Sequence, residues 1–475
     1  MHENETMTSH RQWGVHADLY SSSQDNFLMN HDILNGRSIL IESQLSAQQK
    51  IHIENGLAYS YFHKVPTQKA KVNYFRATIK GNVTRKPTPV MEFNDSAIFL
   101  DKNMAIGTEN PNFEEIHANE ADFIHLNNNF AATLFIGTKL LTIVENFELK
   151  EKSLESLNEG DIVLMVKELP AGDNELISPE KARFLMVMAG DGHVTKDMSR
   201  IFITSGDKDI LENFSELTLK LYNKKAKKEG QYSEVNSVEI CRELAALNLL
   251  SAGKINFRIP KTILGSNKQV LLSALGGLID TDGNIYPQKG QLRIDTTYYN
   301  LAVDVASLLM KLGIYPSINR SKSTYGVRAM ITKSEAKMIG NFVFSERKRN
   351  ALFKIENPKK SRDADLMHLS SPNGLAEIRK LSGYTLESLG KKIGANFKLL
   401  SDWERGIRKP QINKLRKIAE ICQNENLLRL LSGNITTAKI KRLEKISFDA
   451  PRTFLVPKSN KIFVTNFILT KYKEA

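Results

Sequence analysis

Apolar and polar residues follow three different patterns along the chain. Between about 76 and 170, and again from 446 onward, short apolar runs such as "AATLFIG" and "TFLVP" are typical of half-buried β-strands. From 176 to 356, long segments with a helical period, such as "KDILENFSELTLKLY", alternate with short strand segments such as "RIFITS". Residues 374–422 are helical, with glycine breaks. These patterns predict a multidomain α+β protein.

The central pattern occurs twice. A shift of 91 residues places Asp191-Gly192 on Asp282-Gly283. The same shift aligns apolar positions in the segments that follow: Ile201 with Leu292, Ile203 with Ile294, Phe214 with Val305 and Leu217 with Leu308. One constant offset indicates two copies of one supersecondary unit, in the order helix, Asp-Gly stop, strand, long amphipathic helix, further strands and a helix.

Small residues lie on the helix that precedes the second Asp-Gly. In "LLSALGGLIDTDG", Ala274, Gly276 and Gly277 flatten one face, although glycine in a helix costs about 1 kcal/mol relative to alanine. Close approach of a second helix would offset that cost, and "RFLMVMAGDG" in the first copy is a suitable partner. Two such helices side by side would bring Asp191 and Asp282 together at their C-terminal ends.

Two carboxylates at helix C-termini are electrostatically unfavourable unless a cation lies between them. Mg²⁺ suits such a pair, because it commonly binds one or two carboxylates together with water and phosphate oxygens. A single Asp-Gly is better interpreted as a turn that closes a helix. Here it ends both repeated helices, which favours the metal interpretation.

The nine residues "LGGLIDTDG" resemble the LAGLIDADG motif of homing endonucleases, and "FLMVMAGDG" resembles the degenerate first copy of the intein-type (DOD-type) members. The similarity extends from "RIPKTI" through "LLMKLGIYPSI". It implies a pseudo-symmetric pair of αββαββα units whose curved sheets bind DNA. It also implies metal-binding acids at Asp191 and Asp282, with Asp280 secondary, and Mg²⁺-dependent hydrolysis of phosphodiester bonds.

The basic residues that this family uses near the metals match less closely. Intein-type members carry a lysine two residues before the Ile-Pro that precedes the second motif, and this chain has Phe257 there. Arg258 or Lys254 is a substitute, and "SERKRNAL" offers Lys348 where similar proteins have a functional lysine. Met186 replaces a small residue of the first motif. Lys348, Arg258 and Lys254 are therefore added to the two aspartates as candidate catalytic residues.

The strands that follow the motifs predict a DNA-contacting surface. Ile201 and Ile203 are expected in the core, with their neighbours in the strand facing outward. The expected outward or DNA-contacting residues are Arg200, Phe202, Thr204, Gln291, Arg293, Asp295, Arg320, Lys322 and Arg328. Each alone is equally consistent with a solvated face.

Residues 374–422 resemble the Cro/C1-type helix-turn-helix. Thr385-Leu386 opens the first helix of the motif, Ile393-Gly394 lies at the turn, and the recognition helix spans roughly 396–404. This segment has 11 Lys or Arg and 5 Asp or Glu, hence a charge of +6. Its candidate DNA-contacting residues are Asn396, Lys398, Arg405 and Arg408. A helical bundle for protein contacts is the alternative.

The flanking β segments resemble the splicing (Hint) domain of inteins, interrupted by the nuclease. Thr138 stands where splicing proteins have a histidine, and Lys471-Tyr472 stands in place of the terminal His-Asn pair. These replacements predict a domain that no longer splices. An unrelated small β domain is the alternative.

The predicted organisation has five parts. They are a polar region at 1–75, the N-terminal Hint-like part at 76–175, the endonuclease at 176–360 with repeats at about 180–265 and 268–356, the helix-turn-helix at 370–432, and the C-terminal Hint-like part at 440–475. Cys241 and Cys422 have no partner at metal-ligand spacing. No segment predicts a membrane span or a signal peptide, so we expect a cytoplasmic, nucleoid-associated protein, or a nuclear one in a eukaryote.

The net charge of +13 favours a polyanionic partner. The residues together predict a monomeric, site-specific endonuclease that cuts double-stranded DNA at a long target. A non-cleaving DNA-binding regulator is an alternative, because sporulation-type regulators combine a LAGLIDADG fold with a helix-turn-helix. An RNA maturase also fits the charge but explains the Cro-like segment less well.

Overall fold

The computed structural model describes residues 39–40, 52–53, 90–93, 113–128, 130–134, 138–247, 249, 258–321, 324–357, 366–369, 374–432, 435–457, 462–465 and 467–472. Contacts divide the chain into two units, 1–167 with 361–475, and 168–360. The second unit begins at 168, whereas the sequence predicts an endonuclease domain that begins at 176. Among the described residues, no helix combines the length and the hydropathy that a membrane crossing requires.

The first unit contains a mixed β and helical structure. Its N-terminal and C-terminal β segments form one antiparallel sheet, in the order β3-β18-β19-β6-β8-β17-β4-β5 with β7 paired to β6. The described strands are β3 (Val90–Phe93), β4 (Phe113–Leu126), β5 (Ala131–Leu134), β6 (Thr138–Ile143), β7 (Leu149–Ser153), β8 (Ile162–Val166), β17 (Ile435–Pro457), β18 (Ile462–Thr465) and β19 (Ile468–Tyr472). Two further strands, β1 (Ile39–Leu40) and β2 (His52–Ile53), pair with each other.

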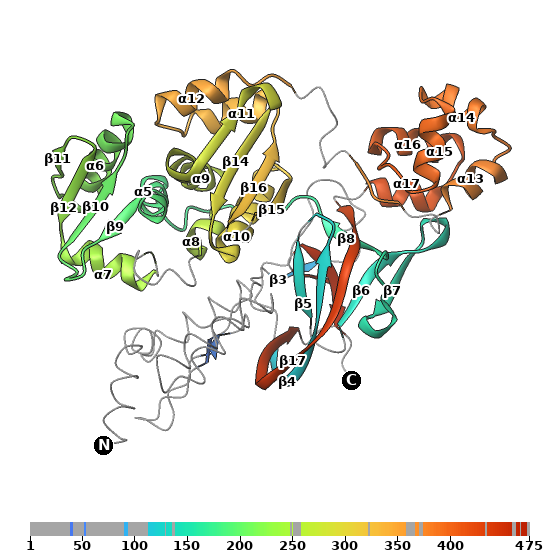
Figure 1. The fold of residues 1–475 in the computed structure, drawn as a ribbon, viewed down its shortest axis with the longest axis horizontal. Coiled ribbons are helices and arrows are strands. Elements are labelled where there is room, and N and C mark those ends of the chain that lie inside the picture. Colours follow the sequence, from blue (N-terminus) through green and yellow to red (C-terminus); the bar gives the residue numbers. More distant parts are fainter. Residues whose placement is uncertain are drawn as a thin grey trace. The chain divides into compact units, whose positions relative to one another are not determined.

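Between residues 374 and 432, which are all described, the chain of this unit forms five helices (Figure 1). They are α13 (Leu375–Leu381), α14 (Leu386–Ile393), α15 (Phe397–Glu404), α16 (Ile412–Ile421) and α17 (Glu425–Ser432). Thr385 caps α14, and Gly394 ends it with φ +67°, a conformation that glycine adopts without steric cost. The Asn396 side chain caps α15 by accepting a hydrogen bond from Leu399 N at 2.7 Å. The predicted helix, turn and recognition helix are confirmed.

The second unit has two halves with the same order of elements. The first half contains α5 (Pro179–Gly190), β9 (Gly192–Val194), β10 (Arg200–Thr204), α6 (Lys208–Tyr222), β11 (Lys227–Glu229), β12 (Tyr232–Asn236) and α7 (Val238–Ala246). After the short α8 (Lys261–Leu264), the second half contains α9 (Lys268–Asp282), β13 (Gly283–Tyr286), β14 (Gln291–Thr296), α10 (Tyr299–Lys311), β15 (Pro316–Arg320), β16 (Tyr325–Met330), α11 (Lys333–Gly340) and α12 (Glu346–Phe353).

The two sheets of this unit also share their strand order. The first is β9-β10-β12-β11 and the second is β13-β14-β16-β15, and every described pairing in them is antiparallel. Ile201 and Ile203 are fully buried, as predicted, and so are Leu292 and Ile294 at the repeat positions. The green and yellow halves lie on either side of α5 and α9 (Figure 1).

Candidate active site

The helices α5 and α9 pack face to face, and glycine makes the close approach possible. A Cβ on Gly277 would lie 2.9 Å from the Arg183 carbonyl oxygen and 3.2 Å from Met186 Cβ, so only glycine fits there. Met186, which replaces a small residue of the first motif, is itself fully buried and packs in this interface. Gly276, also predicted to face α5, instead packs most closely against the Phe342 carbonyl of the loop after α11.

Asp191 and Asp282 lie at the ends of these two helices. Asp191 is the C-cap of α5 and Asp282 is the last residue of α9, and both are half-buried. A Cβ on Gly190 would lie 2.9 Å from Asp282 Oδ2. The Asp282 carboxylate therefore lies beside the residue that precedes Asp191. The packing brings the two helix ends together, as the repeat predicts, while metal binding by the two acids stays a prediction.

Lys348 binds the carbonyl groups at the C-terminal end of α9. Its ammonium donates hydrogen bonds to the carbonyl oxygens of Ile279 at 2.8 Å, Asp280 at 2.6 Å and Thr281 at 3.0 Å. The side chain is buried, and this desolvation is the main reason that its pKa is lowered, with the nearby Asp280 opposing the shift. A cation at these carbonyls offsets the negative end of the helix dipole. The observed role is therefore to stabilise the helix end that carries Asp282, and a catalytic role stays a prediction.

Asp280 points away from the pocket, which corrects its assignment as a secondary metal ligand. It is 2% exposed and forms a buried ion pair with Arg183 of α5. It also accepts hydrogen bonds from the backbone amides of Phe344 at 3.0 Å and Ser345 at 2.9 Å. Asp280 thus joins α9, α5 and the start of α12. The sequence signal for its partner is the arginine inside the apolar helix "RFLMVMAG", a charged residue where the pattern predicts burial.

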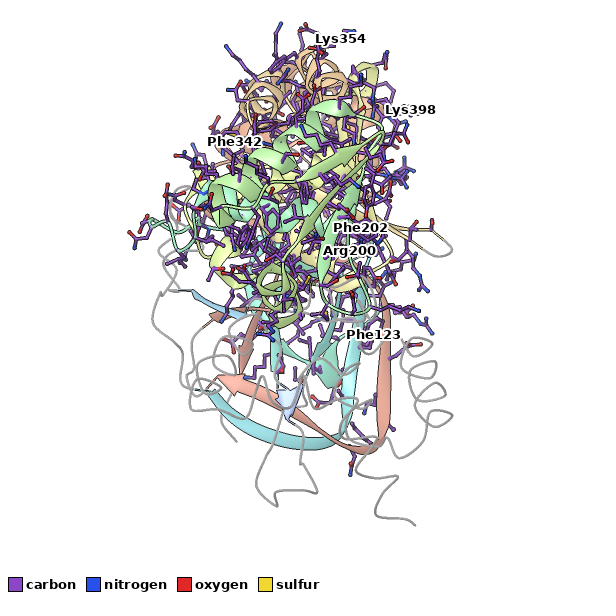
Figure 2. All side chains as sticks on the ribbon, turned by 90° about the vertical axis from the view of Figure 1, so that its left-hand side faces the viewer. Phe123, Arg200, Phe202, Phe342, Lys354 and Lys398 are labelled. Atoms are coloured by element: carbon purple, nitrogen blue, oxygen red, sulfur yellow. The ribbon has the colours of Figure 1, made fainter. Side chains whose placement is uncertain are left out.

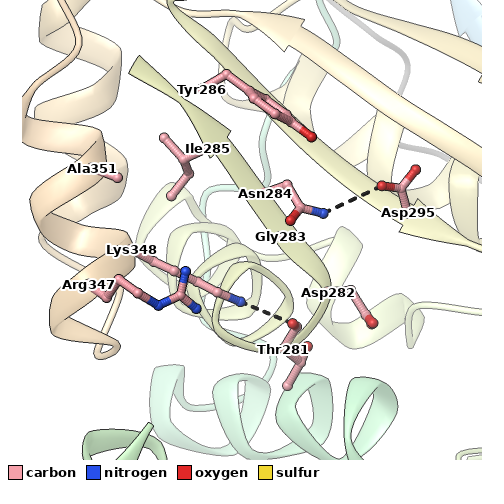
Figure 3. A pocket seen from close by; sticks show the side chains of 10 residues that line it. All are labelled: Thr281, Asp282, Gly283, Asn284, Ile285, Tyr286, Asp295, Arg347, Lys348 and Ala351. Atoms are coloured by element: carbon pink, nitrogen blue, oxygen red, sulfur yellow. Dashed lines mark hydrogen bonds between the residues drawn. The ribbon is translucent and has the colours of Figure 1, made fainter. Parts of the chain in front are cut away.

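Asp282 is one of the residues that line an open pocket of about 520 Å³. Figure 3 shows Asp282 and Thr281 at one side, Arg347 and Lys348 from α12 at another, and Asp295 beyond Asn284. The Arg347 side chain is 72% exposed, and its guanidinium lies 3.5 Å from Asp207. Arg347 is thus a basic side chain at the pocket that sequence reasoning missed in favour of its neighbour Lys348.

The carboxylates of Asp191 and Asp282 can hold a metal ion only if water and substrate supply its other ligands. No group of three or more His, Cys, Asp or Glu residues is arranged for a metal within the described part of the chain. Two helix-end carboxylates are enough for Mg²⁺ when phosphate oxygens and water complete the shell.

The predicted outward residues of the two sheets lie on their outer faces. Arg200 and Thr204 are exposed and Phe202 is half-exposed, and Gln291, Arg293 and Asp295 alternate with buried neighbours. Arg200 and Phe202 are labelled on the first sheet in Figure 2. Arg320 is exposed on β15, and Arg328 is partly exposed on β16. Their alternation is confirmed, and DNA contact stays a prediction.

Three candidate residues of the second unit remain to be placed. One of them lies away from the pocket, and two lie outside the described residues. Arg258 is buried and forms a two-pronged ion pair with Asp304 of α10, at 2.8 and 2.6 Å. This contact holds the segment before α8 onto α10, and a catalytic role for Arg258 stays a prediction. Lys254 and Lys322 lie outside the described residues.

The helix-turn-helix candidates surround α15. Asn396 and Lys398 are exposed in its first turn, where Asn396 also serves as the cap. Arg405 and Arg408 both pair with the buried carboxylate of Asp402, at 2.9 and 3.3 Å, while their side chains stay about 60% exposed. One internal acid therefore fixes two exposed arginines at the end of the helix.

Comparison with known proteins identifies two segments. A LAGLIDADG-like domain matches residues 269–339, from α9 into α11, and a helix-turn-helix matches residues 375–425. The chain therefore contains a LAGLIDADG-like domain and a helix-turn-helix.

Similar proteins have varied names. The replication factor C small subunit of Methanocaldococcus jannaschii is 29% identical over 46% of this chain and 12% of its own length. The isomerizing glutamine-fructose-6-phosphate aminotransferase of the same organism is 25% identical over 57% of this chain and 25% of its own length. The chain thus spans a quarter or less of these two relatives. A structure of mesophilic variants of the homing endonuclease I-DmoI is 18% identical over 38% of this chain and 88% of that chain, with a TM-score of 0.25.

Proposed function

We propose that this protein is a site-specific, metal-dependent endonuclease for double-stranded DNA. The observation that carries the proposal is the packing of α5 on α9, which puts Asp282 beside the end of the helix that Asp191 caps. In this proposal the two halves form a pseudo-symmetric pair, and Asp191 and Asp282 hold Mg²⁺ or a similar divalent cation. The metal would supply Lewis-acid activation of the phosphate and of water.

The other residues of the pocket have separate tasks. Lys348 fixes the α9 terminus, so that Asp282 keeps one position. Arg347 is the exposed cation that can pair with a phosphate oxygen, since its side chain lines the pocket. The outer faces of the two sheets and α15 would contact a long target as a monomer, with α15 extending the recognised sequence.

The β sheet of the first unit is proposed to be a Hint-like domain that no longer splices. Two positions that splicing would need lie opposite each other in the ladder, because Thr138 of β6 pairs with Tyr472 of β19. Neither residue can replace the histidine or the asparagine of a splicing reaction. The matched segment is also a minor part of proteins with unrelated names, which is expected of an inserted element.

A non-cleaving DNA-binding regulator is the second candidate. The observation that favours it is the complete use of the Lys348 ammonium by backbone carbonyls, which leaves the predicted catalytic lysine occupied. A regulator would bind DNA through the same outer faces and α15.

The deciding experiment uses the purified intact chain. It is incubated with a plasmid library of randomised targets and Mg²⁺, and any cut ends are sequenced. We expect cuts at one sequence, their loss in Asp191→Asn and Asp282→Asn, and retained DNA binding in both variants. Tight, sequence-specific binding without cuts would establish the regulator instead.

A further inference from the structure

The two sheets of the second unit present different chemistry at matching positions. The 91-residue offset places Phe202 on Arg293. In the first sheet, Phe202 of β10 lies between His193 of β9 and Glu234 of β12 in the strand register. In the second sheet, Arg293 of β14 lies between Asn284 of β13 and Arg328 of β16. One row therefore contains aromatic rings and an acid, and the other contains two adjacent arginines.

The two arginines are directly opposed, which is unfavourable in an isolated sheet. Like charges at directly opposed positions repel and destabilise the pairing of the two strands. Asp295 reduces this repulsion by accepting a hydrogen bond from Arg293 Nε at 2.7 Å, and the same Oδ1 atom forms an ion pair with Nη2 at 2.6 Å. A Cβ on Gly326 would lie 2.8 Å from Asp295 Oδ1 and 3.0 Å from Arg293 Nε. The ion pair therefore lies flat on β16, where glycine leaves room for it.

Arg328 has an unsatisfied donor at this place. Its Nε is shielded from solvent and has no hydrogen-bond partner among the described residues. A buried donor without an acceptor is unfavourable, because it has lost its hydrogen bonds to water and gained none in the protein. A ligand that presents hydrogen-bond acceptors to the partly exposed side chains of this row relieves the repulsion between the two arginines.

The described residues of the corresponding row in the first sheet include no opposed pair of arginines. Phe202 stacks on His193 with ring centroids 5.0 Å apart, and it also contacts Tyr232. Glu234 lies 3.4 Å from Arg200 and accepts a hydrogen bond from Tyr232 at 2.9 Å. The charge of the arginine on this face is thus balanced by a neighbouring acid.

We propose that Arg293 and Arg328 read guanine in one half of the DNA target, and that the first sheet lacks this preference. The inference rests on the proposed DNA-binding function. In the major groove guanine presents two adjacent acceptors, O6 and N7, which match the paired donors of a guanidinium group. The two opposed arginines, of which Arg293 is held by Asp295 over Gly326, form a donor surface of that kind.

The test begins with selection of randomised 30-bp duplexes by the intact protein without added divalent cation. The selected duplex is then made with 7-deazaguanine, which lacks the N7 acceptor, in one half at a time. We expect about a tenfold loss of affinity or more for one half and little change for the other. Arg328→Lys keeps the charge but loses the paired donors of the guanidinium group, so it should reduce the sensitivity to 7-deazaguanine while most non-specific affinity remains.

Arg242→Ala is the matched control, because this arginine is exposed on α7, outside the strand faces that are proposed to contact DNA, and it should leave the affinity and the guanine preference intact. A selected site whose affinity is unchanged by 7-deazaguanine in either half would overturn the inference. An Arg328→Lys protein that keeps full sensitivity to 7-deazaguanine would also overturn it. The same holds for an Arg328→Ala protein that loses affinity equally for all sequences, because that result is expected of a phosphate contact. Absence of any DNA binding would instead contradict the proposed function.

Discussion

Asp280 and Asp282 are two residues apart on α9, yet they have opposite environments. Two residues turn a helix by about 200°, so the two side chains leave it on opposite sides. Asp280 faces Arg183 and the start of α12 in the interior, and Asp282 faces the pocket. The sequence "DTD" does not tell which acid is exposed, because that depends on how α9 is rotated in the fold.

The two acids should therefore differ in their effect on stability. Asp280→Asn leaves the buried guanidinium of Arg183 without its counter-charge, and we expect a loss of about 3–5 kcal/mol in the free energy of unfolding. Asp282→Asn, two residues away and half-buried, should change it by less than about 1 kcal/mol. Urea unfolding of both variants gives the comparison. Equal effects would mean that Asp282 is also a structural acid.

Lys311, the last residue of α10, gives a stability change with pH. It is 9% exposed, it donates to the Pro170 carbonyl at 2.7 Å, and burial lowers its pKa from 10.5 to about 8. Between these values the unfolded chain holds a proton that the folded chain has released. The free energy of unfolding should therefore rise with pH from about 8 to 10.5, by at most about 3 kcal/mol.

Lys311→Met removes the titrating group and keeps most of the apolar stem. Denaturation midpoints at pH 7.5 and 10 should differ less in this variant than in the parent protein. The same pH response in both proteins would assign it to other groups.

At the scale of elements, the strong periodic patterns were sufficient to locate most of the second unit. α6 spans Lys208–Tyr222, as its amphipathic segment predicts, and β10 and β14 follow the predicted strands closely. The contacts that complete the site were not predictable in this way. Lys348 and the α9 carbonyls are far apart in sequence, and their hydrogen bonds depend on how α12 docks.

The α5–α9 interface gives a prediction in which packing opposes helix propensity. Gly277→Ala should favour the helix by about 1 kcal/mol, but its Cβ would lie 2.9 Å from the Arg183 carbonyl. Forcing the helices apart typically costs about 1–3 kcal/mol, so we expect a net loss of stability and a lower melting temperature. Gly206→Ala has open space around its new methyl group and should leave the melting temperature nearly unchanged. A stabilised Gly277→Ala protein would contradict the close packing.

At the scale of the whole molecule, the net charge of +13 is distributed over two units that both contain candidate DNA-contacting residues. Composition predicts a polyanionic partner, and the repeat and the helix-turn-helix predict which segments would bind it. Neither could indicate which basic side chains are already neutralised. The structure shows that Arg258 is internally paired, whereas Lys398 is exposed on α15.

This difference predicts how binding depends on salt. If Lys398 contacts a phosphate, Lys398→Ala should reduce the slope of log K against log salt concentration by about 0.9, because one fewer counterion is released. Lys220 on α6 is also exposed, with its ammonium near Glu180, but α6 packs against α5 and β12 and is not one of the strands that are proposed to contact DNA. Lys220→Ala removes the same charge from the chain and should leave the slope unchanged. Equal reductions in both variants, measured by titration of a labelled duplex between about 50 and 200 mM salt, would mean that overall charge, rather than contact through α15, determines the salt dependence.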